Sequence, residues 1–193
     1  MGRTRAFDTG EVLDRAMALF WRQGYEATSI QDLVEATRVN RASLYATFGG
    51  KHELFLAVLD HYVSAINGER VALLSRAGSP LAAIQSFFAA SIAEAGADKR
   101  NLGCLITNTL TEMAPSDPAI RAKLAASLRR VEQAFADTLR RAQEAGEVPL
   151  SKDPAALARF LVGVAQGLRV LARSGAPVSV LRDIQSVSLS ALL

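Results

Sequence analysis

The strongest constraint on the fold is a pair of short helical patterns that a tight turn separates between Thr28 and Lys51. The first pattern follows Thr28 and the second follows Asn40, and both residue types commonly cap helix N-termini. In each pattern the apolar residues recur at helical spacing, at Ile30, Leu33, Val34, Leu44 and Phe48. Helices this short are not stable alone in water. The stretch therefore predicts two short helices, joined by a turn at residues 37–39, that pack on neighbouring elements.

The second helix presents an unusual outward face. It carries small residues, hydroxyl groups and one guanidinium, at Arg41, Ala42, Ser43, Tyr45 and Thr47. Arg41 has the geometry to donate two hydrogen bonds to a guanine, and the Ala42 methyl group can contact a thymine methyl. Such a face suits the major groove of DNA better than a second protein core. The pattern predicts a helix-turn-helix, and the alternative is a small helical corner of a core.

Other residues near this helix are expected to contact phosphates, which position the protein without reading the sequence. Net charge does not reveal them, because residues 1–51 hold seven basic and six acidic side chains. Their distribution is more informative, since Arg38, Arg41 and Lys51 all fall on the predicted contact side. The predicted DNA-binding residues are Thr28, Arg38, Asn40, Arg41, Ala42, Ser43, Tyr45, Thr47 and Lys51.

Residues 16–54 resemble the DNA-binding domain of TetR-family transcriptional regulators. The run AMALFWRQGYEATSIQDLVEATRVNRASLYATFGGKHEL contains the family's Leu-Phe, Gly-Tyr, Thr-Ser, Ser-Leu-Tyr and Lys-x-x-Leu in order and spacing. The resemblance implies a three-helix DNA-binding domain at residues 1–50 and a helical effector-binding and dimerisation domain at 51–193. Two residues depart from the pattern: Arg38 stands where Gly is usual, and Thr47 where His or an aromatic residue is frequent. If position 38 has a positive φ, Arg costs roughly 1 kcal/mol there.

The remainder of the chain predicts an all-α fold of about nine helices. Helix starts are indicated at Asp8 or Thr9, at Gly50-Lys51, and at the Asp-Pro pairs 117–118 and 153–154. Further helices are expected at residues 81–97, from about 103 to before Pro115, and at 178–192. No segment alternates with period two for long enough to predict a strand.

Composition excludes several classes of protein. No apolar run reaches the roughly 18 residues of a membrane span, and the start MGRTRAFD lacks the apolar segment of a signal peptide. We therefore expect a cytoplasmic protein without a membrane partner. His52 and His61 lie without nearby ligands at metal-binding spacing, and no Ser/His/Asp set or Gly-rich phosphate loop is present. We expect no metal, no cofactor and no enzymatic activity.

The last two predicted helices carry apolar faces that indicate a dimer interface. The residues are Leu157, Leu161, Val164, Leu168, Leu171, Leu181 and Ile184. In the TetR family the corresponding helices pair with a second copy of themselves, and a two-fold axis matches an inverted-repeat operator. The alternative is that both faces are buried within one subunit.

The effector region is less defined in the sequence. Aromatic residues at helical spacing could line an apolar pocket or simply form core, at Phe55, Tyr62, Phe87, Phe88 and Phe135. The segment NLGCLITNTLTE, which contains Cys104 and Asn108, resembles a Gly-Cys-Leu, Asn and Glu run in one branch of the family. That branch includes sensors of electrophiles or oxidants, so Cys104 at a helix N-terminus is a candidate sensing thiol. The alternative is a small buried packing residue.

These patterns together predict a dimeric, sequence-specific DNA-binding regulator, with repression as the favoured outcome. A small molecule, oxidant or electrophile would release it from double-stranded operator DNA. The alternative function is a helical small-molecule-binding dimer whose DNA binding is weak or vestigial, and the Arg38 departure is the feature that favours it.

Overall fold

The computed structural model describes residues 7–97 and 102–193, and within these ranges every regular element is a helix. Four helices lie in the N-terminal part: α1 (Thr9–Gln23), α2 (Ile30–Thr37), α3 (Arg41–Phe48) and α4 (Lys51–Tyr62). α4 continues without a break through a π-helical turn η1 (Val63–Asn67), α5 (Gly68–Ala72) and a 3₁₀ turn η2 (Leu73–Ser75). The remaining helices are α6 (Pro80–Ala97), α7 (Leu105–Glu112), α8 (Pro118–Glu144), α9 (Pro154–Arg173) and α10 (Val178–Ser190). The all-α prediction is confirmed for the described residues.

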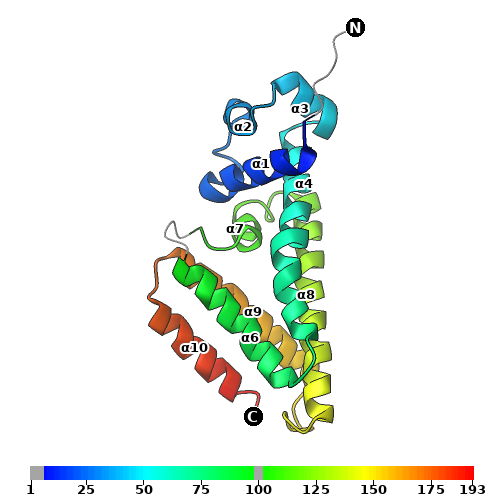
Figure 1. Cartoon of the computed structure of the whole chain (residues 1–193), viewed down its shortest axis with the longest axis vertical. Helices are drawn as coiled ribbons and strands as arrows, with labels where there is room; N and C mark the ends of the chain where they lie inside the picture. Colours follow the sequence, from blue (N-terminus) through cyan, green and yellow to red (C-terminus); the bar gives the residue numbers. More distant parts are fainter. Residues whose placement is uncertain (1–6, 98–101) are drawn as a thin grey trace.

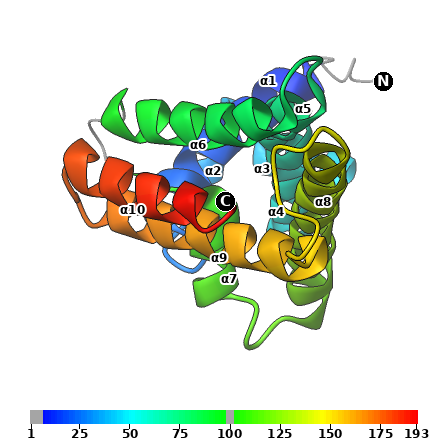
Figure 2. The ribbon, with the colours of Figure 1, turned by 90° about the horizontal axis from the view of Figure 1, so that it is seen from below.

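The helices form two groups along a common spine. α1, α2 and α3 lie at one end of the molecule, on the start of α4, whereas α6, α9 and α10 lie together at the other end (Figure 1). α4 and α8 run side by side between the two groups, and Figure 2 shows the same pairing from below. α7 lies between the groups, so it touches both.

Two hydrophobic cores match this division. The first lies under α1–α4 and also includes Cys104 and Leu105 beside α7, and Ile120 from the start of α8. The second fills the space between α6, α8, α9 and α10. The first core therefore does not stop at residue 50, because α7 and α8 complete it.

Local chemistry explains where the long helices begin. The carboxylates of Asp117 and Asp153 accept hydrogen bonds from the N–H groups of Ile120 and Ala155, and a proline follows each aspartate in the first turn. Proline is tolerated there because the first N–H groups of a helix have no partner within it. Both Asp-Pro starts agree with the sequence prediction.

α9 is long and apolar enough to cross a membrane by length and composition, and 22% of its most apolar window is buried in the single chain. One face packs on α8 through Leu161 and Leu168, which lie in the second core. The opposite face is apolar and open, with Phe160 44% and Val170 53% exposed. The open face indicates a partner for this helix.

This burial corrects part of the predicted dimer interface. Leu161, Leu168 and Leu181 are between 0% and 4% exposed within one chain, so they cannot contact a second copy. The four other predicted residues, Leu157, Val164, Leu171 and Ile184, are half-buried at the edge of the same core. The error has a simple cause: leucines at helical spacing mark the most buried face, which here is the intramolecular one.

Candidate nucleic-acid interface and sensing site

α3 is built to present its N-terminal half to the outside. The Asn40 side chain accepts a hydrogen bond from the Ser43 N–H at 2.8 Å and so caps the helix. Leu44 is 1% exposed and fixes α3 to the first core. Asn40, Arg41, Ala42 and Thr47 are exposed, and Ser43 and Tyr45 are half-buried. The predicted outward face therefore exists, at the end of the molecule opposite α10 (Figure 1).

Arg41 is held along its own helix. Its guanidinium carbon lies 5.1 Å from the centre of the Tyr45 ring, and one of its nitrogens lies 3.4 Å from the Tyr45 hydroxyl. A cation over an aromatic face is attracted by the ring quadrupole. The side chain is thereby kept in place at the start of α3, where a base edge would meet it.

Arg38 has the backbone conformation that its position demands. It ends α2 with φ 60° and ψ 24°, and it is the only residue other than glycine with a positive φ in the described part of the chain. Its N–H donates to the Val34 carbonyl at 2.9 Å, as in a left-handed helix end. Arg38 therefore adopts the positive φ that the sequence left open, and its side chain remains exposed.

Thr28 is not a phosphate contact, contrary to the prediction. It is 0% exposed, and its hydroxyl donates to the Gly24 carbonyl at 2.5 Å. Ser29 caps α2 instead: its hydroxyl accepts from the Asp32 N–H, and the Asp32 carboxylate accepts from the Ser29 N–H. Both Thr and Ser are common caps, and only the chain path shows which one faces the helix end.

Lys51 lies at the start of α4, and its ammonium is 4.2 Å from the centre of the Tyr25 ring. This contact ties the first residue of α4 to the turn between α1 and α2. The side chain is half-buried, on the side of the molecule that carries α3.

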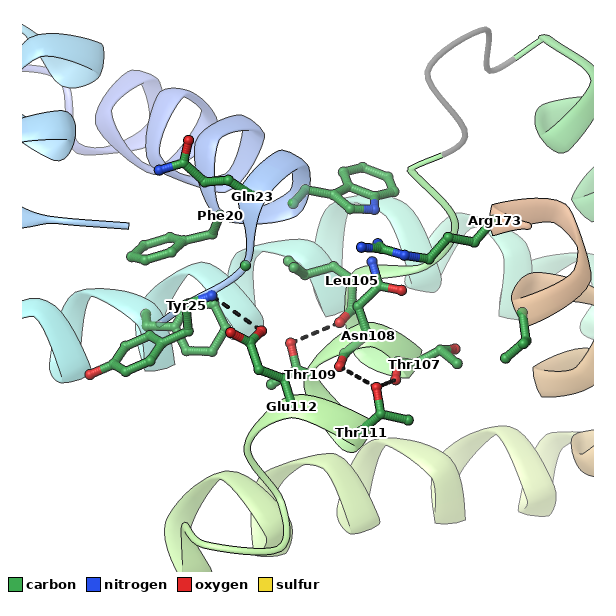
Figure 3. Close-up of a pocket in the computed structure, with 14 residues that line it drawn as sticks. Phe20, Gln23, Tyr25, Leu105, Thr107, Asn108, Thr109, Thr111, Glu112 and Arg173 are labelled. Atoms are coloured by element: carbon green, nitrogen blue, oxygen red, sulfur yellow. Dashed lines mark hydrogen bonds between the residues drawn. The ribbon is translucent and has the colours of Figure 1, made fainter. Parts of the chain in front are cut away.

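The turn between α1 and α2 is also held from α7. The Glu112 carboxylate accepts hydrogen bonds from the N–H group of Tyr25 at 3.2 Å (Figure 3) and from that of Glu26 at 2.9 Å. A contact between side chains also joins α4 to the start of α8: Nε2 of His52 lies 2.7 Å from Oδ2 of Asp117. In the sequence, Glu112 was noted only as the last residue of the segment NLGCLITNTLTE, and no role was predicted for it.

Cys104 immediately precedes α7 and lies in the first core, and its side chain makes no capping hydrogen bond. The thiol is 2% exposed, and the Tyr62 hydroxyl donates to Sγ at 3.3 Å. Burial alone would raise the pKa of the Cys104 thiol, but the Arg169 charge and hydrogen bonds from Tyr62 and Thr107 together bring that pKa below its usual value. The Tyr62 pKa is raised, chiefly by burial. The thiol is thus buried, and its surroundings lower its pKa.

The loop before Cys104 connects three helices. The Leu102 carbonyl accepts hydrogen bonds from Trp21 Nε1 on α1 at 3.2 Å, from Asn108 Nδ2 on α7 at 2.9 Å and from the Arg173 guanidinium on α9 at 3.0 Å. The Trp21 ring also meets the Tyr62 ring edge-on at 5.1 Å. A change at Cys104 therefore has a short path of contacts to α1.

A pocket of about 370 Å³ opens beside this loop (Figure 3). We call it the interdomain pocket. It is lined by Phe20, Trp21, Gln23, Gly24, Tyr25, Phe55, Leu105, Thr107, Asn108, Thr109, Thr111, Glu112, Val170 and Arg173.

Comparisons with known proteins decide the family. Residues 12–58 match the profile "Bacterial regulatory proteins, tetR family", and residues 80–182 match "Tetracyclin repressor-like, C-terminal domain". The chain belongs to the TetR family of transcriptional regulators. Its members are in general regulators and not enzymes.

Named relatives agree over the full length. The chain is 38% identical to the HTH-type transcriptional repressor ComR of Escherichia coli K12, over 97% of this chain and 90% of ComR. It is 36% identical to the uncharacterized regulator YezE of Bacillus subtilis 168, over 100% of both chains. Among solved structures, a cysteine variant of the TetR-family regulator CifR in complex with 26-bp operator DNA matches with a TM-score of 0.89 and 32% identity, over 99% of this chain and 100% of that one.

Within this TetR-family fold the predicted effector residues fall into separate places. Phe87, Phe88 and Phe135 pack on one another with ring centres 4.8–5.9 Å apart, and they belong to the second core, away from Cys104. These three residues therefore lie in a different core from Cys104. Tyr62 contacts Cys104, whereas Phe55 and Asn108 line the interdomain pocket.

Proposed function

We propose that this TetR-family regulator represses transcription as a homodimer bound to an inverted-repeat operator, with one α3 in the major groove of each half-site. The observation that carries the proposal is the capped, exposed N-terminal half of α3 with Arg41 at its start. The family membership, the relative named as a repressor and the CifR–operator complex support it. We infer that it acts in the cytoplasm and in regulation, not catalysis.

The dimer in this proposal uses the open faces of α9 and α10. Phe160, Val170, Val180 and Val187 are 40–71% exposed, although they are large and apolar. On α9, Gly163 and Gly167 lie on the same side, and nothing lies within 4 Å of where their Cβ atoms would be. Small residues let two helices approach closely, and a two-fold axis there would set two α3 helices in major grooves about 34–36 Å apart.

The contacts divide by role. Arg41 and Ala42 lie at the start of α3, where they would meet base edges, and Ser43 follows them. Arg38, Asn40, Tyr45, Thr47 and Lys51 would hold phosphates around this helix. Position 47 has a short hydroxyl side chain, so its phosphate contact requires a close approach of α3 to the backbone.

We further propose that Cys104 senses electrophiles. The thiolate adds to the β-carbon of an α,β-unsaturated carbonyl: an S–C bond forms, the C=C π pair moves to the α-carbon, and that carbon takes up a proton. The adduct has no room beside Tyr62, which is 0% exposed and touches Trp21. Displacing Tyr62 would move Trp21 and α1, and the operator-binding geometry with them. In the competing interpretation Cys104 is only a small packing residue.

Selection from a random DNA pool tests the operator proposal. An inverted repeat should be recovered, Arg41→Ala should relax one position in each half-site, and Lys51→Gln should weaken all sequences equally and flatten the salt dependence. Failure to enrich any sequence over bulk DNA would favour the alternative, a small-molecule-binding helical dimer with vestigial DNA contacts.

N-ethylmaleimide tests the sensing proposal, because Cys104 is the single cysteine of the chain. Treatment should release the wild type from its operator and leave Cys104→Ser bound. Equal responses of the two proteins would remove Cys104 from the mechanism.

A further inference from the structure

The interdomain pocket is a feature that neither operator binding nor the Cys104 proposal uses. Its walls come from α1 and α4 on one side and from α7 and α9 on the other, so a bound molecule would touch both helix groups (Figure 3). Its volume of about 370 Å³ lies at the lower end of the range for small-molecule sites. Cys104 is not among its lining residues.

Two opposite charges lie in this pocket. Glu112 is at the end of α7 and Arg173 at the end of α9; in Figure 3 the Arg173 side chain extends toward Asn108, whereas the Glu112 carboxylate faces the turn at Tyr25. Within residues 7–97 and 102–193 neither charge has an ion-pair partner closer than 4 Å. Charges that line a pocket and form no ion pair within the described residues can pair with a charged ligand.

Hydrogen-bonding capacity remains at both groups. A carboxylate offers about four lone-pair sites, and Glu112 uses two of them for the N–H groups of Tyr25 and Glu26. A guanidinium carries five N–H donors, and Arg173 gives one to the Leu102 carbonyl. The Arg173 guanidinium can therefore bind a carboxylate, and the Glu112 carboxylate can accept a hydrogen bond from a further donor.

The spacing of the two groups sets the length of the ligand. Asn108 and Glu112 are four residues apart on α7, which is about 6 Å along the axis. The Arg173 guanidinium shares the Leu102 carbonyl with Asn108, so it lies near the other end of this stretch. Apolar walls lie between them, including Phe20, Phe55 and Leu105. A charged group at each side of an apolar wall suits a ligand with a single aromatic ring and one polar group at each end.

We propose that the interdomain pocket binds a small aromatic carboxylate that carries a hydrogen-bond donor in the para position. The carboxylate pairs with Arg173, the ring lies against the apolar wall, and the donor reaches Glu112. The same Glu112 carboxylate holds the turn between α1 and α2, so occupancy bears directly on the position of the helix-turn-helix.

Isothermal titration of the full-length protein with 4-hydroxybenzoate tests the proposal. We expect saturable binding with one site per chain and a Kd in the range of about 10 µM to 1 mM, given the ligand's size. Benzoate, which lacks the donor, and methyl 4-hydroxybenzoate, which lacks the charge, should each bind about tenfold more weakly. These comparisons use the unaltered protein, so they do not depend on whether any variant folds.

Variants then locate the site. Arg173→Gln should weaken 4-hydroxybenzoate binding about tenfold or more, and Glu112→Gln should reduce the difference between 4-hydroxybenzoate and benzoate, because a neutral amide oxygen is a weaker acceptor than a carboxylate. Arg140→Gln is the matched control, because Arg140 is an exposed arginine on α8 outside the pocket, and it should bind as the wild type does. Either of two results would overturn the proposal: no binding by the wild type up to about 10 mM ligand, or equal binding by Arg173→Gln. Neither result bears on operator binding, which is measured separately.

Discussion

The Glu112 carboxylate on α7 accepts the N–H of Tyr25 at 3.2 Å, in the turn that leads into the DNA-binding helices. The residue before that turn, Gly24, has φ 85° and ψ 174°, and a Cβ there would lie 2.9 Å from a Glu112 oxygen. The backbone of α1 and the side chain of α7 thus meet at a position where only glycine fits.

Gly24→Ala is expected to destabilise the protein by about 2–3 kcal/mol, chiefly because the backbone at Gly24 has a conformation that is essentially limited to glycine. The end of the Glu112 side chain must also shift, which weakens its hydrogen bonds to the turn. Urea unfolding measures the change. Gly146→Ala is the control: Gly146 also has a positive φ of 72°, but nothing lies within 4 Å of its Cβ position. The control should cost only about 1 kcal/mol. Equal losses in the two variants would show that the Glu112 contact is not restrictive.

Arg38→Gly separates backbone strain from charge at the end of α2. Removing the Cβ from a residue with φ 60° should raise the free energy of unfolding by up to about 1 kcal/mol. If Arg38 contacts a phosphate, the slope of log affinity against log salt should fall by about one. Arg38→Lys keeps the charge and the strain, so it should change neither quantity appreciably. A slope in Arg38→Gly equal to that of the wild type would remove Arg38 from the contact set.

The Asp117 carboxyl makes the stability of the fold depend on pH, and the direction of its pKa shift fixes the direction of that dependence. The N–H of Ile120 is the main cause that lowers the Asp117 pKa, and His52 lowers it further. Because the pKa is lower in the folded than in the unfolded chain, this stabilisation is present above about pH 4 and is lost as the pH falls through the folded value. The Tm difference between wild type and Asp117→Asn should therefore shrink below about pH 4. A difference that is constant from neutral pH to pH 3 would contradict the assignment.

The open faces of α9 and α10 predict which substitutions break the dimer. Val187→Asp places a charge on a residue that is 71% exposed in the single chain, so it should raise the dimer dissociation constant by tenfold or more with little effect on the fold. Leu161→Ala changes a fully buried residue and should instead cost about 2–5 kcal/mol of stability. Sedimentation over a range of concentrations and urea unfolding distinguish the two effects. A fully dimeric Val187→Asp protein would place the interface elsewhere.

The sequence predicted most of the local structure because capping and periodicity act over a few residues. Asn40 caps α3, and the Asp-Pro pairs start α8 and α9, all as their residue types indicate. These features depend on one to four neighbours along the chain, so no knowledge of packing is needed to place them.

The sequence alone therefore determined the helices, the family and the outward residues of α3. The tertiary structure decided what depends on how helices meet: Thr28 is buried while Ser29 caps α2, and Leu161 faces α8 and not a second copy. It alone placed Glu112 against Tyr25, which is 87 residues away in the chain. Helical periodicity identifies which residues share a face, but only the packing of the helices fixes what that face contacts.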